Sequence, residues 1–132
     1  MSSSFPLEGL TPLIADRFLN TYIAGEDLLT IGLVVELTGD WTVKRCNTMN
    51  STKVVGLNLT IAKNGQKVTV VARGIARAIA YGNIVAGDQV ISASAGSGIG
   101  MIQTDNTSKN TTVLGQAIAG AVSGGTAIII LW

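Results

Sequence analysis

Short runs of β-branched and other apolar residues, separated by turn residues at intervals of about ten, are the feature that most constrains the fold of this chain. Nine such runs follow residue 30. Residues that tolerate positive φ or bond their own backbone lie between them, and Asn64-Gly65 is the strongest hairpin signal. The runs are Ile31–Leu37, Trp41–Arg45, Lys53–Thr60, Gln66–Ala72, Gly74–Ala80, Asp88–Ala93, Gly98–Gln103, Thr111–Ile118 and Gly125–Leu131. The sequence therefore predicts an all-β fold, a small barrel or sandwich of about eight to nine short strands.

The placement of proline and glycine agrees with a body that is nearly all sheet. Both prolines, Pro6 and Pro12, lie in the first dozen residues, so every later backbone N–H is available for a ladder hydrogen bond. One of the 16 glycines, Gly74, separates two strand-like runs. We expect a bulge or bend there, because a residue without a Cβ lets the ladder turn a corner.

The two halves of the chain resemble each other. Val55-Gly56-Leu57 and the later Gly65 are matched, 59 residues on, by Leu114-Gly115-Gln116 and Gly124, each pair being followed by an apolar run. Ala24-Gly25-Glu26-Asp27 is also similar to Ala86-Gly87-Asp88, at a slightly different spacing. We therefore expect two pseudo-repeats, the alternative being chance similarity between short glycine-rich segments.

The first residues stand outside this pattern. We divide the chain into an extended N-terminal arm, residues 1–22, and a single β domain, residues 23–132, with a short helical turn expected from Thr11-Pro12 to Phe18. The arm is expected to reach another subunit or surface, or else to cover an open end of the barrel as a plug. Its candidate contact residues are Phe5, Pro6, Leu7, Leu10, Leu13, Ile14 and Phe18.

Composition narrows the choice of partners. Hydrophobic residues make up 47% of the chain and charged residues 13%, with a net charge of +1, so we expect extensive burial and no binding to nucleic acid. Between Asp88 and Trp132 only Asp105 and Lys109 are charged, which suggests that the second half is buried against other subunits. The apolar stretch 117–132 is too short to span a membrane and is interrupted by glycines, so we expect a strand over Ala127–Leu131 that is packed on both faces or lies at a subunit contact.

The sequence offers no recognisable catalytic, metal or cofactor site. It has no histidine, and its carboxylates are dispersed except for Glu26-Asp27, which we interpret as a turn feature. The single cysteine, Cys46, excludes an intramolecular disulfide and a zinc site within one chain, so we expect a small buried residue in a cytosolic product. The pair Arg73 and Arg77 is expected either to contact acidic groups of a partner or to face solvent.

The order of several short motifs resembles the capsid cement, or decoration, proteins of tailed bacterial and archaeal viruses. The resemblance starts near residue 22 and continues to the C-terminus. It implies a compact, non-enzymatic β protein on the outer surface of the virion, commonly a homotrimer, that binds the major capsid protein and stabilises the shell. The motifs are Ala24-Gly25-Glu26-Asp27, Gly32-Leu33-Val34-Val35, Val54-Val55-Gly56-Leu57, Lys63 to Val70, Arg73-Gly74-Ile75-Ala76, Val85 to Val90, and Val113-Leu114-Gly115-Gln116-Ala117.

Two other classes stay open. A glycan- or receptor-binding β module would normally show clustered exposed aromatic residues, whereas Tyr22, Trp41, Tyr81 and Trp132 are scattered along the sequence. A small β-barrel enzyme or cofactor carrier is disfavoured, because histidine is missing and no lysine lies in a recognisable carrier turn.

Overall fold

A computed structural model of the chain describes residues 17–49, 51–93, 99–105 and 113–132. These residues form strands and turns without a helix, so the predicted all-β fold is confirmed, and none of them lies in a helix that could cross a membrane. The strands are β1 (Phe18–Ala24), β2 (Val34–Gly39), β3 (Thr42–Arg45), β4 (Val54–Asn58), β5 (Lys67–Ile79), β6 (Gln89–Ser92), β7 (Ile102–Thr104), β8 (Gly115–Ala119) and β9 (Thr126–Leu131).

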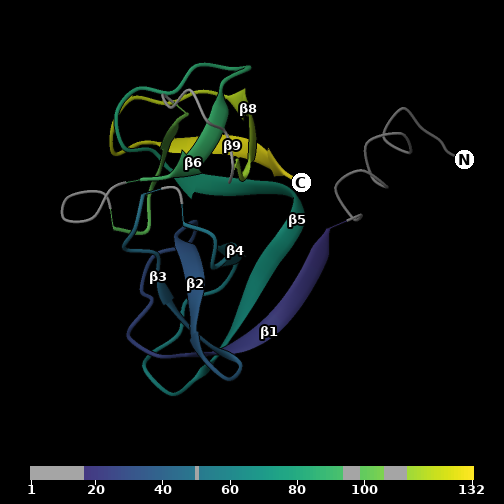
Figure 1. Ribbon diagram of the computed structural model, residues 1–132, viewed down its shortest axis with the longest axis vertical. Helices are drawn as coiled ribbons and strands as arrows, with labels where there is room; N and C mark the ends of the chain where they lie inside the picture. Colours follow the sequence, from purple (N-terminus) through teal and green to yellow (C-terminus); the bar gives the residue numbers. More distant parts are fainter. Residues whose placement is uncertain (1–16, 50, 94–98, 106–112) are drawn as a thin grey trace, which may run out of the picture.

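Five strands close into a barrel, which we call the N-terminal unit. Their spatial order is β1-β3-β2-β4-β5, and the barrel closes because β1 also pairs with the first part of β5. The β1–β3 pairing is parallel, and the remaining pairings in this unit are antiparallel. Figure 1 shows this unit in the lower part of the molecule. Closure of the barrel pairs the backbone N–H and C=O groups that the edge strands of an open sheet would leave exposed.

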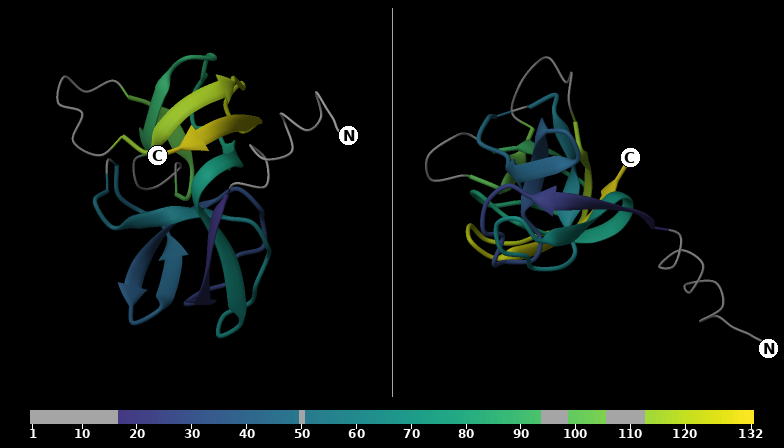
Figure 2. Two further views of the ribbon diagram at one scale, coloured as in Figure 1. Left: turned by 90° about the vertical axis from the view of Figure 1, so that its right-hand side faces the viewer. Right: turned by 90° about the horizontal axis from the view of Figure 1, so that it is seen from below.

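The second part of β5 begins another sheet, which we call the C-terminal unit. Its order is β5-β9-β8-β6-β7, with antiparallel pairing throughout. The two outer strands of this sheet approach each other through a parallel bridge between Ala80 and Ile102. This unit occupies the upper part of Figure 1, and Figure 1 and the left view of Figure 2 show β5 running from one unit into the other.

Gly74 is the point at which β5 changes unit. The two runs separated by this glycine form one strand of 13 residues, not two strands as the sequence suggested. The expected bend is confirmed: Gly74 has φ +105°, and a Cβ built there would lie 3.1 Å from the Cα of Arg17. A side chain at this position would therefore clash with the chain that enters β1.

Two equivalent glycines confirm the pseudo-repeat. Gly56 in β4 and Gly115 in β8 both press against a carbonyl group of the neighbouring strand. A Cβ would lie 2.0 Å from the oxygen of Val71 at the first position and 1.9 Å from that of Ile130 at the second. These carbonyls are themselves 59 residues apart, so the chain spacing and the packing coincide.

One predicted correspondence between the halves is wrong. Gly87 corresponds to Gly32, not to Gly25. The N–H of Gly87 donates to the carbonyl of Ala117 at 2.8 Å, as the N–H of Gly32 donates to that of Asn58 at 3.1 Å. Both glycines have φ above +90°. The two Ala-Gly-acid segments are similar only in local sequence. The repeat is defined by the hydrogen bonds between strands, which local composition does not indicate.

The N-terminal boundary of the folded body also differs from the prediction. Strand β1 begins at Phe18, inside the segment that was assigned to the arm, and it pairs with both β3 and β5. Phe18 is therefore a strand residue and not the end of a helical turn. The strand was missed because its pairing partners lie about 20 and 50 residues away in the sequence, and strand formation depends strongly on such contacts.

The core extends across both units. Leu57 and Val71 of the N-terminal unit belong to the same buried cluster as Ala127 and Ile129 of the C-terminal unit. A second cluster, which includes Leu28, lies in the N-terminal unit alone. Strand β5 joins the two parts of this core, because it contributes Val71 before Gly74 and Ala76 after it.

Candidate interaction surface

The residues predicted to form an arm fall mostly outside the described part of the chain. This applies to Phe5, Pro6, Leu7, Leu10, Leu13 and Ile14. Phe18 is described: it starts β1, pairs with Arg73 and is 64% exposed. The folded body therefore presents a large aromatic side chain to solvent at the place where the N-terminal segment joins it.

A groove of about 400 Å³ lies at the junction of the two units. Ile31 contributes to it from the N-terminal unit, and Ile75, Arg77 and Ile128 from the C-terminal unit. Arg17, the first described residue, also lines it. The groove thus combines aliphatic side chains with two guanidinium groups. Of the predicted Arg73–Arg77 pair, Arg77 faces this groove.

An apolar face continues from the groove over the outside of β5, β9 and β8. In β9 the side chains alternate, with Ala127, Ile129 and Leu131 buried and Ile128 and Ile130 on the other side. Ile130 pairs with Ile75, and Ile128 pairs with Arg77. Ile118 of β8 is 49% exposed and Ile128 is 37% exposed. We call Ile75, Ile118, Ile128 and Ile130 the isoleucine face.

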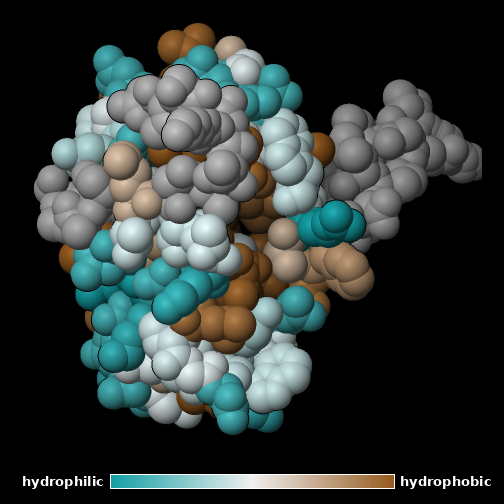
Figure 3. Space-filling view, viewed as in Figure 1, coloured by the Kyte–Doolittle hydropathy of each residue, from teal (hydrophilic) through white to brown (hydrophobic). Residues whose placement is uncertain are grey.

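Within one chain β9 is therefore covered on one side. The predicted strand is present, but the option that it packs on both faces is wrong for the single chain. Figure 3 shows apolar atoms reaching the surface in a band across the middle of the molecule, where the units meet. Such a surface is typical of a site that is covered by another molecule.

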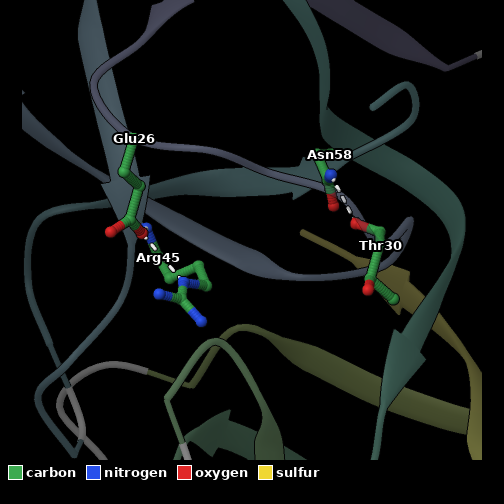
Figure 4. A network of polar contacts seen from close by, with 4 residues as sticks. All are labelled: Glu26, Thr30, Arg45 and Asn58. Carbon is green, nitrogen blue, oxygen red and sulfur yellow. Dashed lines mark hydrogen bonds and ion pairs between the residues drawn. The ribbon is translucent and has the colours of Figure 1, made fainter. Parts of the chain in front are cut away.

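Asn58 holds the loop that supplies Ile31 to the groove. This asparagine is 2% exposed, and its side-chain oxygen accepts a hydrogen bond from the N–H of Leu33 at 2.7 Å. Its amide nitrogen donates to the carbonyl of Thr30 at 2.7 Å (Figure 4) and to that of Thr60 at 3.1 Å. Because a buried amide must be satisfied, these bonds fix the loop against β4.

Glu26 and Asp27 have separate structural partners. Glu26 accepts hydrogen bonds at 2.9 Å from both the backbone N–H and the side-chain Nε of Arg45 (Figure 4). Asp27 accepts one at 2.8 Å from the N–H of Asn64. Partial burial tends to raise the pKa of Glu26, but the hydrogen bonds and charge of Arg45 outweigh it and lower that pKa. The two carboxylates thus tie the segment after β1 to distant parts of the chain, Glu26 to the end of β3 and Asp27 to the turn at Asn64.

Cys46 is buried, as predicted, with 1% of its surface exposed. Its Sγ lies 3.3 Å from the carbonyl oxygen of Thr48 and 3.7 Å from a carboxylate oxygen of Glu36. Burial raises the pKa of the thiol, so it stays protonated and unreactive at neutral pH.

Two of the aromatic residues that are scattered in the sequence meet in space. Tyr22 and Trp41 have ring centroids 5.8 Å apart and planes inclined by 37°. The parallel pairing of β1 with β3 brings them together, since Ile23 is opposite Thr42. No local motif signals this contact, because parallel neighbours are joined by a long connection.

The fold is similar to a known one, although no protein-family model and no curated protein matches the chain. A solved structure described as the head fiber gp8.5 N base in bacteriophage phi29 superimposes with a TM-score of 0.60. The alignment covers 88% of this chain and 94% of that chain at 19% sequence identity. At this identity the likeness is one of fold.

Proposed function

We propose that this protein is a structural component of a virus particle that binds the outer surface of an icosahedral capsid and stabilises it, as a decoration protein does. The observation that carries the proposal is the fold likeness to the head fiber base, which extends over most of both chains. The motif resemblance to decoration proteins, which comes from the sequence, points to the same role.

The proposed role is non-enzymatic and requires no cofactor. The sequence has no histidine, and the adjacent carboxylates Glu26 and Asp27 are engaged in structural hydrogen bonds. Protein surfaces are the proposed partners, namely the major capsid protein and further copies of this chain. We place the protein on the outside of the virion after synthesis in the host cytoplasm.

The isoleucine face is proposed as the contact between copies in a homotrimer. Its exposed side chains are aliphatic, so it lacks the charges that would keep two such faces apart in water. Arg77, which lies opposite Ile128, would then be placed at the rim of the contact, where a charge retains water. In this arrangement the open side of β9 is covered by a neighbouring subunit.

Capsid attachment is assigned to the N-terminal segment up to Phe18. Three copies in one trimer would bind together, so a modest affinity of each becomes a slow overall release. The exposed ring of Phe18 and the apolar residues that precede it supply the contact chemistry.

Binding to shells tests the proposal directly. Expanded capsids that lack this protein are mixed with the purified chain, sedimented and imaged. Regular density on the outer surface is the expected result. If the chain stays in the supernatant and the shells remain bare at saturating protein, the proposal fails.

A deletion separates attachment from folding. Removal of residues 2–16 spares β1, which starts at Phe18, and we expect an unchanged melting temperature with loss of co-sedimentation. The alternative, in which the segment is a plug, predicts a much lower melting temperature, because each buried large side chain contributes about 1.5–3 kcal/mol. A variant that still sediments with capsids like the intact protein contradicts the assignment of these residues.

A further inference from the structure

We propose that Tyr22 and Trp41 form a binding site for a glycan, in which a pyranose ring stacks on the indole of Trp41. The site is separate from the surfaces assigned above. It consists of a cavity of about 390 Å³ lined by Tyr22, Leu37, Gly39, Asp40 and Trp41, a volume in the range of small-ligand sites.

The backbone holds the two rings in place. Tyr22 belongs to β1, and Trp41 lies in the turn between β2 and β3. The N–H of Ile23 donates to the carbonyl of Trp41 at 2.6 Å, which ties the turn to β1 beside Tyr22. Trp41 nevertheless remains 67% exposed, so its ring is available to a ligand from the solvent side.

Trp41 occupies a position that would suit a smaller residue better. Its φ is +53°, and it is the one non-glycine residue with positive φ in the described part of the chain. Bulky residues are uncommon in this conformation, which favours glycine and tolerates asparagine. Folding of the turn therefore does not explain the tryptophan.

The C-terminal unit provides an internal comparison for both aromatic residues. Val43 and Ile102 are equivalent, because they accept matching hydrogen bonds from Gly25 and Tyr81. Two residues before Ile102 stands Gly100, with φ +72°, where the N-terminal unit has Trp41. The same backbone conformation is thus built with glycine in one unit and with tryptophan in the other.

The counterpart of Tyr22 is small as well. Ala24 and Ala80 are equivalent, since their N–H groups donate to Gln66 and Gly125, and two residues earlier Ala78 takes the place of Tyr22. Ala78 is fully buried. The repeat therefore folds without either ring, and the aromatic pair is specific to the N-terminal unit.

The chemistry of the cavity suits a sugar better than a nucleic acid. A pyranose presents C–H groups on its face and hydroxyls at its rim, and aromatic rings stack on such a face. Asp40 supplies a carboxylate that has no hydrogen bond or ion pair with any described residue, so it is free to accept sugar hydroxyls. The same negative charge opposes a phosphate backbone.

The site lies at the far end of the N-terminal unit. In the left view of Figure 2 the β2–β3 hairpin is at the bottom, and β8 and β9 are at the top. A ligand bound at the hairpin would therefore leave the isoleucine face uncovered. Glycan binding and capsid binding are independent properties and can be tested separately.

The chain has two tryptophans, which makes the test direct. In a Trp132→Phe variant, Trp41 is the sole tryptophan, and its fluorescence is titrated with the β-1,4-linked tetramers of N-acetylglucosamine and of glucose. We expect a saturable change in emission with at least one tetramer. No change with either at about 10 mM, a concentration that would reveal even millimolar affinity, overturns the proposal.

Two further variants assign the effect to the site. Trp41→Asn is expected to weaken tetramer binding at least tenfold by calorimetry and to leave the melting temperature equal or higher, because asparagine tolerates the left-handed turn. Asp40→Asn is expected to weaken binding several-fold. If Trp41→Asn binds the tetramer normally, the site is wrongly placed. If the tetramers do not bind and Trp41→Asn loses co-sedimentation with capsids, the surface around Tyr22 and Trp41 is a protein contact. The glycan proposal then fails.

Discussion

The two units share a topology but differ in what their surfaces carry. The first closes through the β1–β5 pairing, and the second approaches closure through the Ala80–Ile102 bridge, with the same order of equivalent strands. The N-terminal unit contains the Glu26–Arg45 pair and the Tyr22–Trp41 contact. The C-terminal unit exposes Ile118 and Ile128 on the outside of β8 and β9. Backbone contacts thus specify the repeat, and the outward side chains are free to serve different partners.

The largest expected effect on stability tests whether both units depend on their equivalent glycines, Gly56 and Gly115. Gly56→Ala and Gly115→Ala each place a Cβ about 2 Å from a carbonyl oxygen, so we expect each to lower the free energy of unfolding by about 3 kcal/mol or more. Chemical denaturation measures both losses. Gly65→Ala and Gly124→Ala are matched controls, because open space surrounds these positions, and the left-handed conformation alone should cost about 1–2 kcal/mol.

A tolerated change at one glycine would break the comparison. If Gly115→Ala behaved like its control while Gly56→Ala did not, the second unit would relax where the first cannot. The packing equivalence of β4 and β8 would then be incorrect.

A smaller effect on the free energy of unfolding is expected at the loops that precede β2 and β6. The two units fix these equivalent loops in different ways. Asn58 does so in the N-terminal unit and is fully buried, so Asn58→Ala should cost about 2–3 kcal/mol by leaving backbone groups unsatisfied. In the C-terminal unit Asp88 accepts bonds at 3.0 Å from Val85 and Thr104, and it is partly exposed.

Asp88→Ala serves as the comparison for that prediction. We expect a loss of about 1 kcal/mol, because water can replace the partners of an accessible group. Thermal and denaturant unfolding of both variants give the difference. Equal losses would show that burial does not distinguish the two loops.

The isoleucine face is tested by placing the same charge at equivalent positions of the two units. Ile128 and Thr69 both point outward and are 59 residues apart. We expect Ile128→Lys to weaken self-association at least tenfold in analytical ultracentrifugation, with little change in melting temperature because the lysine stem covers apolar surface. Thr69→Lys should leave association unchanged. Equal behaviour of the two variants would remove the face from the subunit contact.

The smallest effect concerns the ion pair of the N-terminal unit. The Glu26 and Arg45 side chains are 28% and 42% exposed, so solvent screens the pair and Glu26→Gln should cost at most about 0.5 kcal/mol at pH 7. Because the folded-state pKa of Glu26 is lowered, this stability is present above the ordinary carboxyl pKa of about 4.3 and disappears as the pH falls through the lower, folded-state value. A difference between the two proteins that persists at pH 2 would contradict this origin.

Features that depend on local sequence were predicted correctly, whereas features that depend on long-range pairing were not. The bend at Gly74 and the burial of Cys46 followed from residue type and local pattern, and both were correct. Strand β1 and the joining of two runs into β5 were not foreseen. Both depend on hydrogen bonds between distant segments, such as the pairing of Phe18 with Arg73.

The sequence by itself determined that the chain is all-β, that it turns at Asn64-Gly65 and that it repeats after 59 residues, because alternation, turn chemistry and glycine spacing act over a few residues. Tertiary structure alone decided that Tyr22 meets Trp41, that Ile31 joins Ile128 in one groove, and that one side of β9 stays open. These contacts arise from the order of strands in each unit. That order is selected by long-range pairing and core packing, on which local sequence carries little information.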